Sequence, residues 1–119
     1  MTETQFKHKV EKYLEELPQS WFIKYWAGPK FTKEGIPDIL ACINGQFYGI
    51  ELKTDNGRPT LLQIVNLRNI RAAGGIGVLL YPNDFAYFQA LVERKSPLSE
   101  HWYRENIQLQ KDWFEKLNK

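Results

Sequence analysis

The chain has 119 residues, of which 43% are hydrophobic and 14% aromatic, a composition typical of one folded domain over residues 1–119 and not of a disordered chain. Its net charge of +2 is too small for a protein that coats DNA generally, and its lone cysteine, Cys42, excludes an intrachain disulfide and a cysteine-based zinc cluster. Because we find no membrane-spanning apolar run, signal peptide or glycine-rich phosphate loop, we expect a cytoplasmic protein with no membrane partner and no nucleotide cofactor.

The apolar residues follow helical spacing in some segments and strand-like runs in others, and turn residues separate these segments. Helices and short strands interspersed in this way are typical of an α/β fold. In chain order, the sequence predicts a helix at 3–17, strands at 21–26, 39–43 and 47–53, a helix at 60–73, a strand at 76–81, a helix that Asn83 or Asp84 caps and that runs through Leu91, and a last helix at 102–117.

Two connections predict how the strands pair. Asn44-Gly45 is typical of a two-residue hairpin turn, so the strands on either side of it should be antiparallel. The helix at 60–73, closed by Gly74-Gly75, separates two apolar runs and predicts a crossover between parallel strands. We therefore expect a mixed sheet flanked by helices, with the strand at 47–53 in its centre.

Two carboxylates and an amine fall near the ends of the hairpin strands. Glu51 and Lys53 share one face of their strand, because side chains alternate with a period of two, and Asp38 should lie across the hairpin from Glu51. Mg²⁺ is commonly held by one or two carboxylates together with substrate phosphates, so this set predicts a metal site. The alternative is that Glu51 and Lys53 lie on the ordinary solvated face of a half-buried sheet.

The order of these motifs carries a resemblance to a known family. Gly-x-Pro-Asp at 35–38, a hairpin, Glu-x-Lys at 51–53 and a helix bearing Gln63 resemble the PD-(D/E)XK nuclease superfamily, most closely its VRR-NUC branch of small phage, bacterial and eukaryotic nuclease domains. The archaeal Holliday junction resolvases are similar too. The likeness covers residues 3–81, and nothing from Ser96 onward contributes to it.

This resemblance implies a restriction-endonuclease-like core at about 3–95 with a C-terminal helical extension at about 99–118. It implies an endonuclease that uses Mg²⁺ or Mn²⁺ to hydrolyse DNA, on branched or structured substrates such as Holliday junctions, in a bacterial or phage-infected cell. The matching catalytic residues are Asp38, Glu51, Lys53 and Gln63. The matching metal ligands are Asp38, Glu51, the Leu52 carbonyl and a glutamate of the first helix.

Two of these assignments have rivals. The first helix offers four glutamates: Glu3, Glu11, Glu15 and Glu16. Helical phase places Glu3 within the apolar arc and Glu11 off its centre, so we expect Glu3 to be the ligand; alternatively, Glu3 only favours the helix dipole. Thr60-x-x-Gln63 also matches a capping box, in which the glutamine side chain returns to the helix start instead of serving the site.

Basic residues gather in the sequence around the motif. The positions that we expect to contact DNA phosphates are Lys24, Lys30, Lys33 and Arg58, and surface lysines are common enough to offer a plain alternative. Trp26 and Phe31 lie in the same stretch and could stack on splayed bases, or pack in the core.

The last helix and the function itself each leave alternatives. The helix has a rich apolar side that either closes the core or meets a second copy in a homodimer, which would present two sites to two DNA strands. Besides a DNA endonuclease, the chain could be a DNA-binding or assembly module that keeps the fold without catalysis. A third interpretation is a nuclease of the same fold that is directed at RNA.

Overall fold

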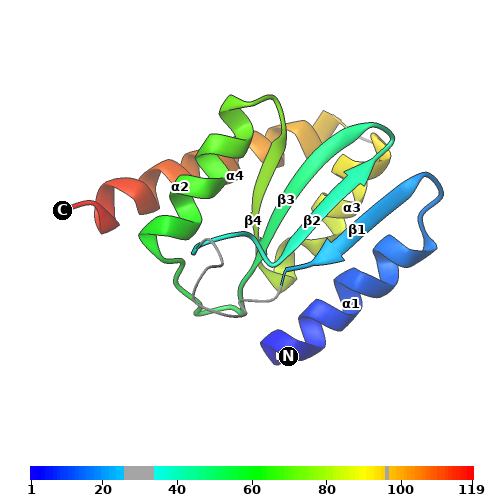
Figure 1. Cartoon of the computed structure of the whole chain (residues 1–119), viewed down its shortest axis with the longest axis horizontal. Coiled ribbons are helices and arrows are strands. Elements are labelled where there is room, and N and C mark those ends of the chain that lie inside the picture. Colours follow the sequence, from blue (N-terminus) through cyan, green and yellow to red (C-terminus); the bar gives the residue numbers. More distant parts are fainter. Residues whose placement is uncertain (26–33, 96) are drawn as a thin grey trace.

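Four strands form one mixed sheet in the order β1-β2-β3-β4 (Figure 1). The computed structural model describes residues 1–25, 34–95 and 97–119. β1 and β2 pair antiparallel, as do β2 and β3, whereas β3 and β4 are parallel, so both predicted pairings and the inner position of β3 are confirmed. The strands are β1 (Ser20–Lys24), β2 (Ile39–Ile43), β3 (Gln46–Leu52) and β4 (Ile76–Leu80).

The turn between β2 and β3 sets their register. Asn44 and Gly45 have φ values of 52° and 79°, the two positive values that a type I′ turn requires. Ile43 therefore pairs with Gln46, and the ladder continues to Ile39 opposite Ile50. Because a shift of one residue would turn every side chain to the other face, this turn decides which residues of the two strands share a face.

The helices lie close to their predicted positions. The last one begins at Pro97, five residues before the predicted start, because proline suits the first turn of a helix. Within the part of the chain that the structure describes, no helix combines the length and apolarity needed to cross a membrane. The helices are α1 (Glu3–Glu16), α2 (Leu61–Ala72), the 3₁₀ turn η1 (Pro82–Asp84), α3 (Phe85–Glu93) and α4 (Pro97–Leu117).

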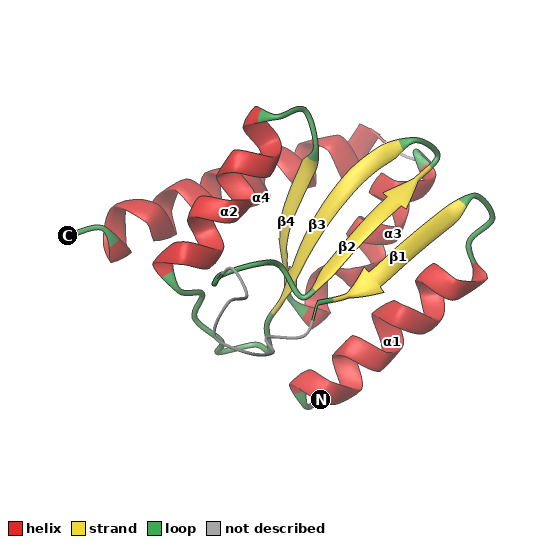
Figure 2. Ribbon diagram, in the orientation of Figure 1, coloured by secondary structure: helices red, strands yellow, loops and turns green. Residues whose placement is uncertain are grey.

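Helices cover both faces of the sheet (Figure 2). α1 and α3 pack on the face that carries Tyr48, Ile50 and Val78, which we call the core face. α2 packs on the opposite face, where Leu79 contributes to a second apolar cluster. By strand alternation Glu51 belongs to this opposite face, which we call the Glu51 face. The structure is thus an α/β fold with a mixed sheet flanked by helices, as predicted.

Two glycines let α2 approach the Glu51 face closely. Gly49 of β3 and Gly77 of β4 are paired in register. A Cβ atom on Gly77 would lie 2.7 Å from the Leu67 carbonyl oxygen, and one on Gly49 would lie 2.5 Å from the flexible end of the Ile70 side chain. Since real Cβ atoms do not approach backbone so closely, the Leu67 contact shows that α2 rests on the backbone of β4 at Gly77, while the side chain of Ile70 fills the space above Gly49.

Side chains of α4 pair the outer edge of β4. Asn106 accepts from the Leu79 amide at 3.0 Å and donates to the Leu79 carbonyl at 2.7 Å. Gln110 donates to the Gly77 carbonyl at 2.9 Å, and the Tyr103 hydroxyl accepts from the Gly77 amide at 3.1 Å. These bonds satisfy backbone groups that would otherwise invite another strand, so α4 closes this edge of the sheet.

Much of the apolar side of α4 packs within the chain, as the first of the two alternatives for this helix predicts, although Leu109 is exposed. Trp102 belongs to the main core, so the segment predicted as an extension contributes to the fold itself. Residues near the end of α4 pack with α2 and the end of β4. This second cluster is built on Ile64, Leu67 and Leu79, with Tyr81, Trp113, Phe114 and Leu117 against it.

The start of α3 departs in part from the prediction. Asp84 occupies the N-cap position, one of the two residues predicted there, but its side chain makes no capping bond, so its position is confirmed and its capping role is not. The Asp84 carboxylate accepts a hydrogen bond from the Trp102 side chain, while burial raises its pKa. Asp84 is therefore held by α4, and the 3₁₀ turn that begins at Pro82 leads directly into α3.

We expect Asn106→Ala to lower the free energy of unfolding by about 2 to 4 kcal/mol, because both polar groups of buried Leu79 would lose their partner. This loss should occur although alanine is the better helix former. Urea unfolding measures it, with Gln108→Ala as the control, since the hydrogen bond that Gln108 makes to Asp112 lies on the exposed side of the same helix. Equal midpoints for the two variants would show that the edge pairing contributes nothing.

Candidate active site

The hairpin brings Asp38 and Glu51 together. Ile39 pairs with Ile50, so the next position along the ladder places Asp38 opposite Glu51, as predicted. Lys53 lies two residues beyond Glu51 on the same face, and its amide donates to the Leu80 carbonyl at 3.0 Å. The Lys53 ammonium lies 3.4 Å from Glu51 Oε2. The predicted carboxylate pair and its adjacent amine are therefore one cluster, where the start of β2 meets the end of β3.

Glu51 is buried, with only 1% of its surface exposed. One carboxyl oxygen, Oε2, faces Lys53, and the other, Oε1, is buried with no hydrogen-bond partner in the described structure. Burial, the charge of neighbouring Asp38 and a side-chain hydrogen bond with Asp38 together raise the pKa of Glu51 from an ordinary 4.5 to about 8, while Lys53 acts to lower it. The alternative of an ordinary solvated face is therefore wrong for Glu51.

Both oxygens of Asp38 have partners. Oδ2 accepts a hydrogen bond from the Leu52 amide at 2.9 Å, which ties the carboxylate to the neighbouring strand. Oδ1 lies 3.4 Å from the Lys7 ammonium of α1. The Asp38 carbonyl also accepts from the Tyr25 amide at 2.8 Å, extending the pairing of β1 with β2 by one residue. Asp38 is thus fixed by three separate elements of the fold.

The donors of this cluster fit a hard divalent cation. Asp38 and Glu51 supply carboxylate oxygens from the neighbouring ends of two paired strands. Within the described residues Glu51 Oε1 has no hydrogen-bond partner, although a side-chain interaction with Asp38 helps to keep the Glu51 carboxyl protonated. Over the described ranges, no group of three or more His, Cys, Asp or Glu side chains is arranged to hold a metal. A cation here would need water, backbone carbonyls or a substrate phosphate to complete its shell; the Leu52 carbonyl stays a predicted ligand.

The expected position of Glu3 is not found. Glu3 is exposed in the first turn of α1, which follows the capping box of Thr2 and projects past the ends of the strands (Figure 1). Helical phase gave its direction around the helix, but the sheet does not extend far enough to cover it. The buried acid of α1 is instead Glu11, whose carboxylate lies 3.6 Å from the Lys24 ammonium.

Gln63 forms the capping box of α2. Its side-chain oxygen accepts from the Thr60 amide at 2.9 Å, and its own amide donates to the Thr60 hydroxyl at 3.2 Å. The capping interpretation is confirmed, and the side-chain oxygen is committed to it. A role for Gln63 in catalysis stays a prediction that the side-chain nitrogen alone could serve.

The predicted phosphate-binding residues are dispersed. Lys24 is exposed and faces Glu11, and the Arg58 guanidinium lies 5.3 Å from the ring centre of Trp113, so it is a cation–π partner of α4. Lys30 and Lys33 fall outside the described residues, as do Trp26 and Phe31, the two aromatic residues that could stack on bases.

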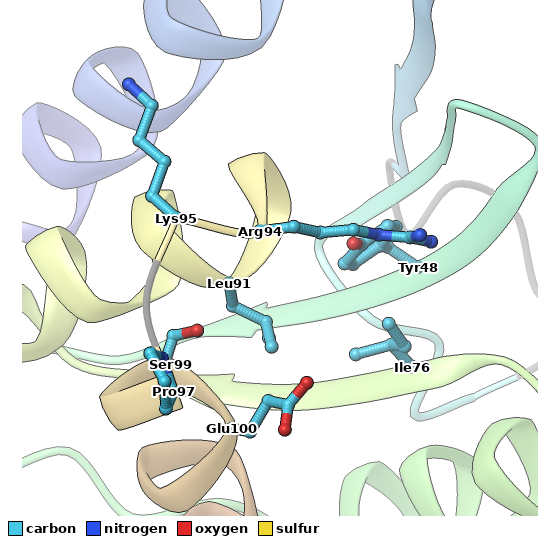
Figure 3. Close-up of a pocket in the computed structure, with 8 residues that line it drawn as sticks. All are labelled: Tyr48, Ile76, Leu91, Arg94, Lys95, Pro97, Ser99 and Glu100. Atoms are coloured by element: carbon cyan, nitrogen blue, oxygen red, sulfur yellow. The ribbon is translucent and has the colours of Figure 1, made fainter.

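A cavity of about 520 Å³ opens on the other side of the sheet, between β3, β4 and the ends of α3 and α4 (Figure 3). Tyr48 of its lining belongs to the core face, so this cavity is separated from Glu51 by the sheet. In Figure 3, Arg94 reaches across Tyr48 while Lys95 points away from the cavity. The cavity is therefore not part of the carboxylate cluster.

A second hollow lies on the Glu51 face. It measures about 390 Å³, and its lining includes Pro37, Leu40, Phe47 and Ile70. Pro37 directly precedes Asp38, and Phe47 lies at the hairpin end of β3, where it is substantially exposed. The hollow thus lies beside α2, between Pro37 and the hairpin end of β3, and its lining includes neither Asp38 nor Glu51.

Lys7 contacts Asp38, although the sequence pattern predicted no role for it. Its position carried a weak signal, since it follows buried Phe6 and precedes buried Val10 by three residues. Such a position borders the apolar stripe of a helix, so a long side chain there can reach over the covered surface. The spacing alone could not show that Asp38 lies under it.

Comparison of the chain with protein-family models, with curated proteins and with solved structures finds no match.

The raised pKa of Glu51 predicts how the metal-free protein responds to pH. In EDTA the folded state keeps a proton that the unfolded state releases, so stability should fall as the pH rises from about 4.5 to 8. Glu51→Gln removes this dependence. Compared with the parent chain, the variant should be more stable at pH 9 by up to roughly 5 kcal/mol more than it is at pH 5.

Urea unfolding at the two pH values measures the difference between Glu51→Gln and the parent chain. Exposed Glu16→Gln is the control, because it removes an acid from the surface of α1. If the free energies of unfolding of Glu51→Gln and of the parent chain differ by the same amount at pH 5 and pH 9, Glu51 does not titrate with a raised pKa in the folded protein.

Proposed function

We propose that this chain is a metal-dependent DNA endonuclease with a restriction-endonuclease-like core, similar to the VRR-NUC nucleases. The observation that carries the proposal is Glu51, a buried carboxyl with one unsatisfied oxygen beside a second carboxyl, Asp38. Asp38 and Glu51 belong to the motifs that suggested the family: Gly-x-Pro-Asp, a hairpin and then Glu-x-Lys.

The energetics of Glu51 favour a cation over a structural role. A buried carboxyl that served only the fold would be expected to have both oxygens hydrogen-bonded, because an unsatisfied buried acceptor costs about 1 to 3 kcal/mol. Among the described residues Oε1 has no hydrogen-bond partner, and the charge of Asp38 and its side-chain hydrogen bond with Glu51 both make ionisation of Glu51 harder. Such a cost is typical of functional sites, where a ligand supplies the missing interaction.

The proposed roles follow from the positions of the side chains. Asp38 and Glu51 would hold Mg²⁺ or Mn²⁺, with the Leu52 carbonyl as a further ligand. When bound, the cation supplies charge neutralisation at the phosphate and an acidified water. Lys53 keeps an ammonium 3.4 Å from Glu51 Oε2, where it would place positive charge beside the reacting phosphate or orient the attacking water.

The substrate class rests on the resemblance. Stand-alone VRR-NUC proteins and Holliday junction resolvases suggest branched or structured DNA, cut by a homodimer, in the cytoplasm of a bacterial or phage-infected cell. Lys24 and Arg58 are exposed and would contribute phosphate contacts only by leaving Glu11 and Trp113.

Cleavage of labelled duplex, flap and four-way-junction DNA with Mg²⁺, Mn²⁺ or EDTA tests the proposal. We expect metal-dependent cutting that falls at least a hundredfold in Asp38→Asn and in Glu51→Gln, because each variant loses a charged ligand. These variants are preferred to alanine, since the asparagine side chain could still accept from the Leu52 amide and the glutamine side chain fills the same buried volume. Circular dichroism confirms that both variants fold.

The other interpretations give different results. Salt-sensitive DNA binding without cutting would replace the proposal with the non-catalytic module. Metal-dependent cutting of RNA, with matched DNA left intact, would favour the RNA-directed nuclease. Cutting that both variants retain in full would show that the carboxylate pair is not the active site.

A further inference from the structure

Lys7 approaches the candidate site from a different element than the other site residues. It lies on α1, which is anchored on the core face by the fully buried side chains of Phe6 and Val10. Its ammonium lies 3.4 Å from Asp38 Oδ1. Because the helix backbone is fixed by its packing, the backbone of Lys7 stays close to Asp38 and its ammonium remains within reach of that carboxylate.

Lys7 meets the Asp38 oxygen that the backbone does not hold. Oδ2 accepts from the Leu52 amide at 2.9 Å, so Oδ1 is the oxygen more readily offered to a cation. The ammonium of Lys7 lies against that oxygen. A divalent cation shared by Asp38 and Glu51 would therefore meet a positive charge at the position it needs, and the two cations repel each other.

The two lysines of the site differ in their freedom to move. The Lys53 side chain is only 14% exposed and extends from an inner strand toward Glu51. The Lys7 side chain is 37% exposed and stands on a helix at the margin of the site. A lysine ammonium on a flexible four-carbon stem can swing toward water at little cost, so Lys7 is the one that can leave.

We propose that Lys7 is a positioning residue that exchanges partners: it holds Asp38 in the metal-free protein, leaves Asp38 when a divalent cation binds, and then contacts a phosphate oxygen of the DNA. This inference rests on the proposed nuclease function. The exchange couples the two ligands: a bound cation frees the Lys7 ammonium to contact a DNA phosphate, so each ligand should raise the affinity of the protein for the other. It also gives α1 a part in the site that does not depend on a glutamate ligand.

The exchange predicts opposite effects of one substitution on two ligands. Lys7→Met keeps the length of the side chain and removes its charge. Without the competing ammonium, Mn²⁺ should bind about threefold to tenfold more tightly in the absence of DNA. Without the phosphate contact, the DNA concentration for half-maximal cleavage at saturating Mn²⁺ should rise several-fold. A residue that only supported the fold would weaken both.

Isothermal titration with Mn²⁺ alone, on the parent chain and on variants, makes the test. Lys12→Met is the matched control, because it removes one exposed positive charge from the same helix. Lys7→Arg keeps the charge and should keep the affinity for Mn²⁺ near that of the parent. We expect Lys7→Met to bind Mn²⁺ more tightly and to need more DNA for half-maximal cleavage. Lys12→Met should change neither.

Two failures can be told apart. If Asp38→Asn binds Mn²⁺ as the parent chain does, the carboxylate pair is not the metal site and the proposed function fails. If Asp38→Asn loses Mn²⁺ while Lys7→Met and Lys12→Met bind it equally, or Lys7→Met binds it more weakly than the parent, the partner exchange is overturned and the nuclease proposal stands.

Discussion

The structure depends on one unfavourable arrangement, the burial of the Glu51 carboxyl beside a second carboxyl on an inner strand. Burial and the neighbouring Asp38 raise its pKa to about 8, and one of its oxygens has no partner. A protein tolerates such a group only where surrounding structure fixes it, because the favourable contacts made elsewhere must exceed its cost. The strands and helices around Glu51 fix its position in this way.

The surrounding features constrain β3 from every side. The turn at Asn44-Gly45 fixes its register with β2, and the crossover through α2 places β4 parallel on its other side. α4 then closes the free edge of β4 with Asn106 and Gln110, whose bonds replace those of a further strand. Glu51 therefore cannot move toward solvent without disturbing the whole sheet, and this rigidity holds two carboxylates in place in the absence of a cation.

Local signals were enough to predict the pairing of Asp38 with Glu51, because a two-residue turn and strand alternation act over a few residues. The remaining errors and omissions depend on tertiary structure. Helical phase could not show that α1 projects past the sheet at Glu3, nor that Lys7 reaches Asp38. A polar residue such as Asn106 is read from sequence as part of an exposed surface, although it pairs a strand edge in the interior.

The most direct measurement is the location of a bound cation. Crystals soaked in Mn²⁺, with anomalous diffraction data, show where the ion lies, and Glu51→Gln crystals provide the control. Our account predicts an anomalous peak within bonding distance of Asp38 and of Glu51 Oε1, absent from the control, with the Lys7 ammonium displaced from Asp38. A protein that cuts DNA but shows no peak there, with Lys7 still on Asp38, would contradict it.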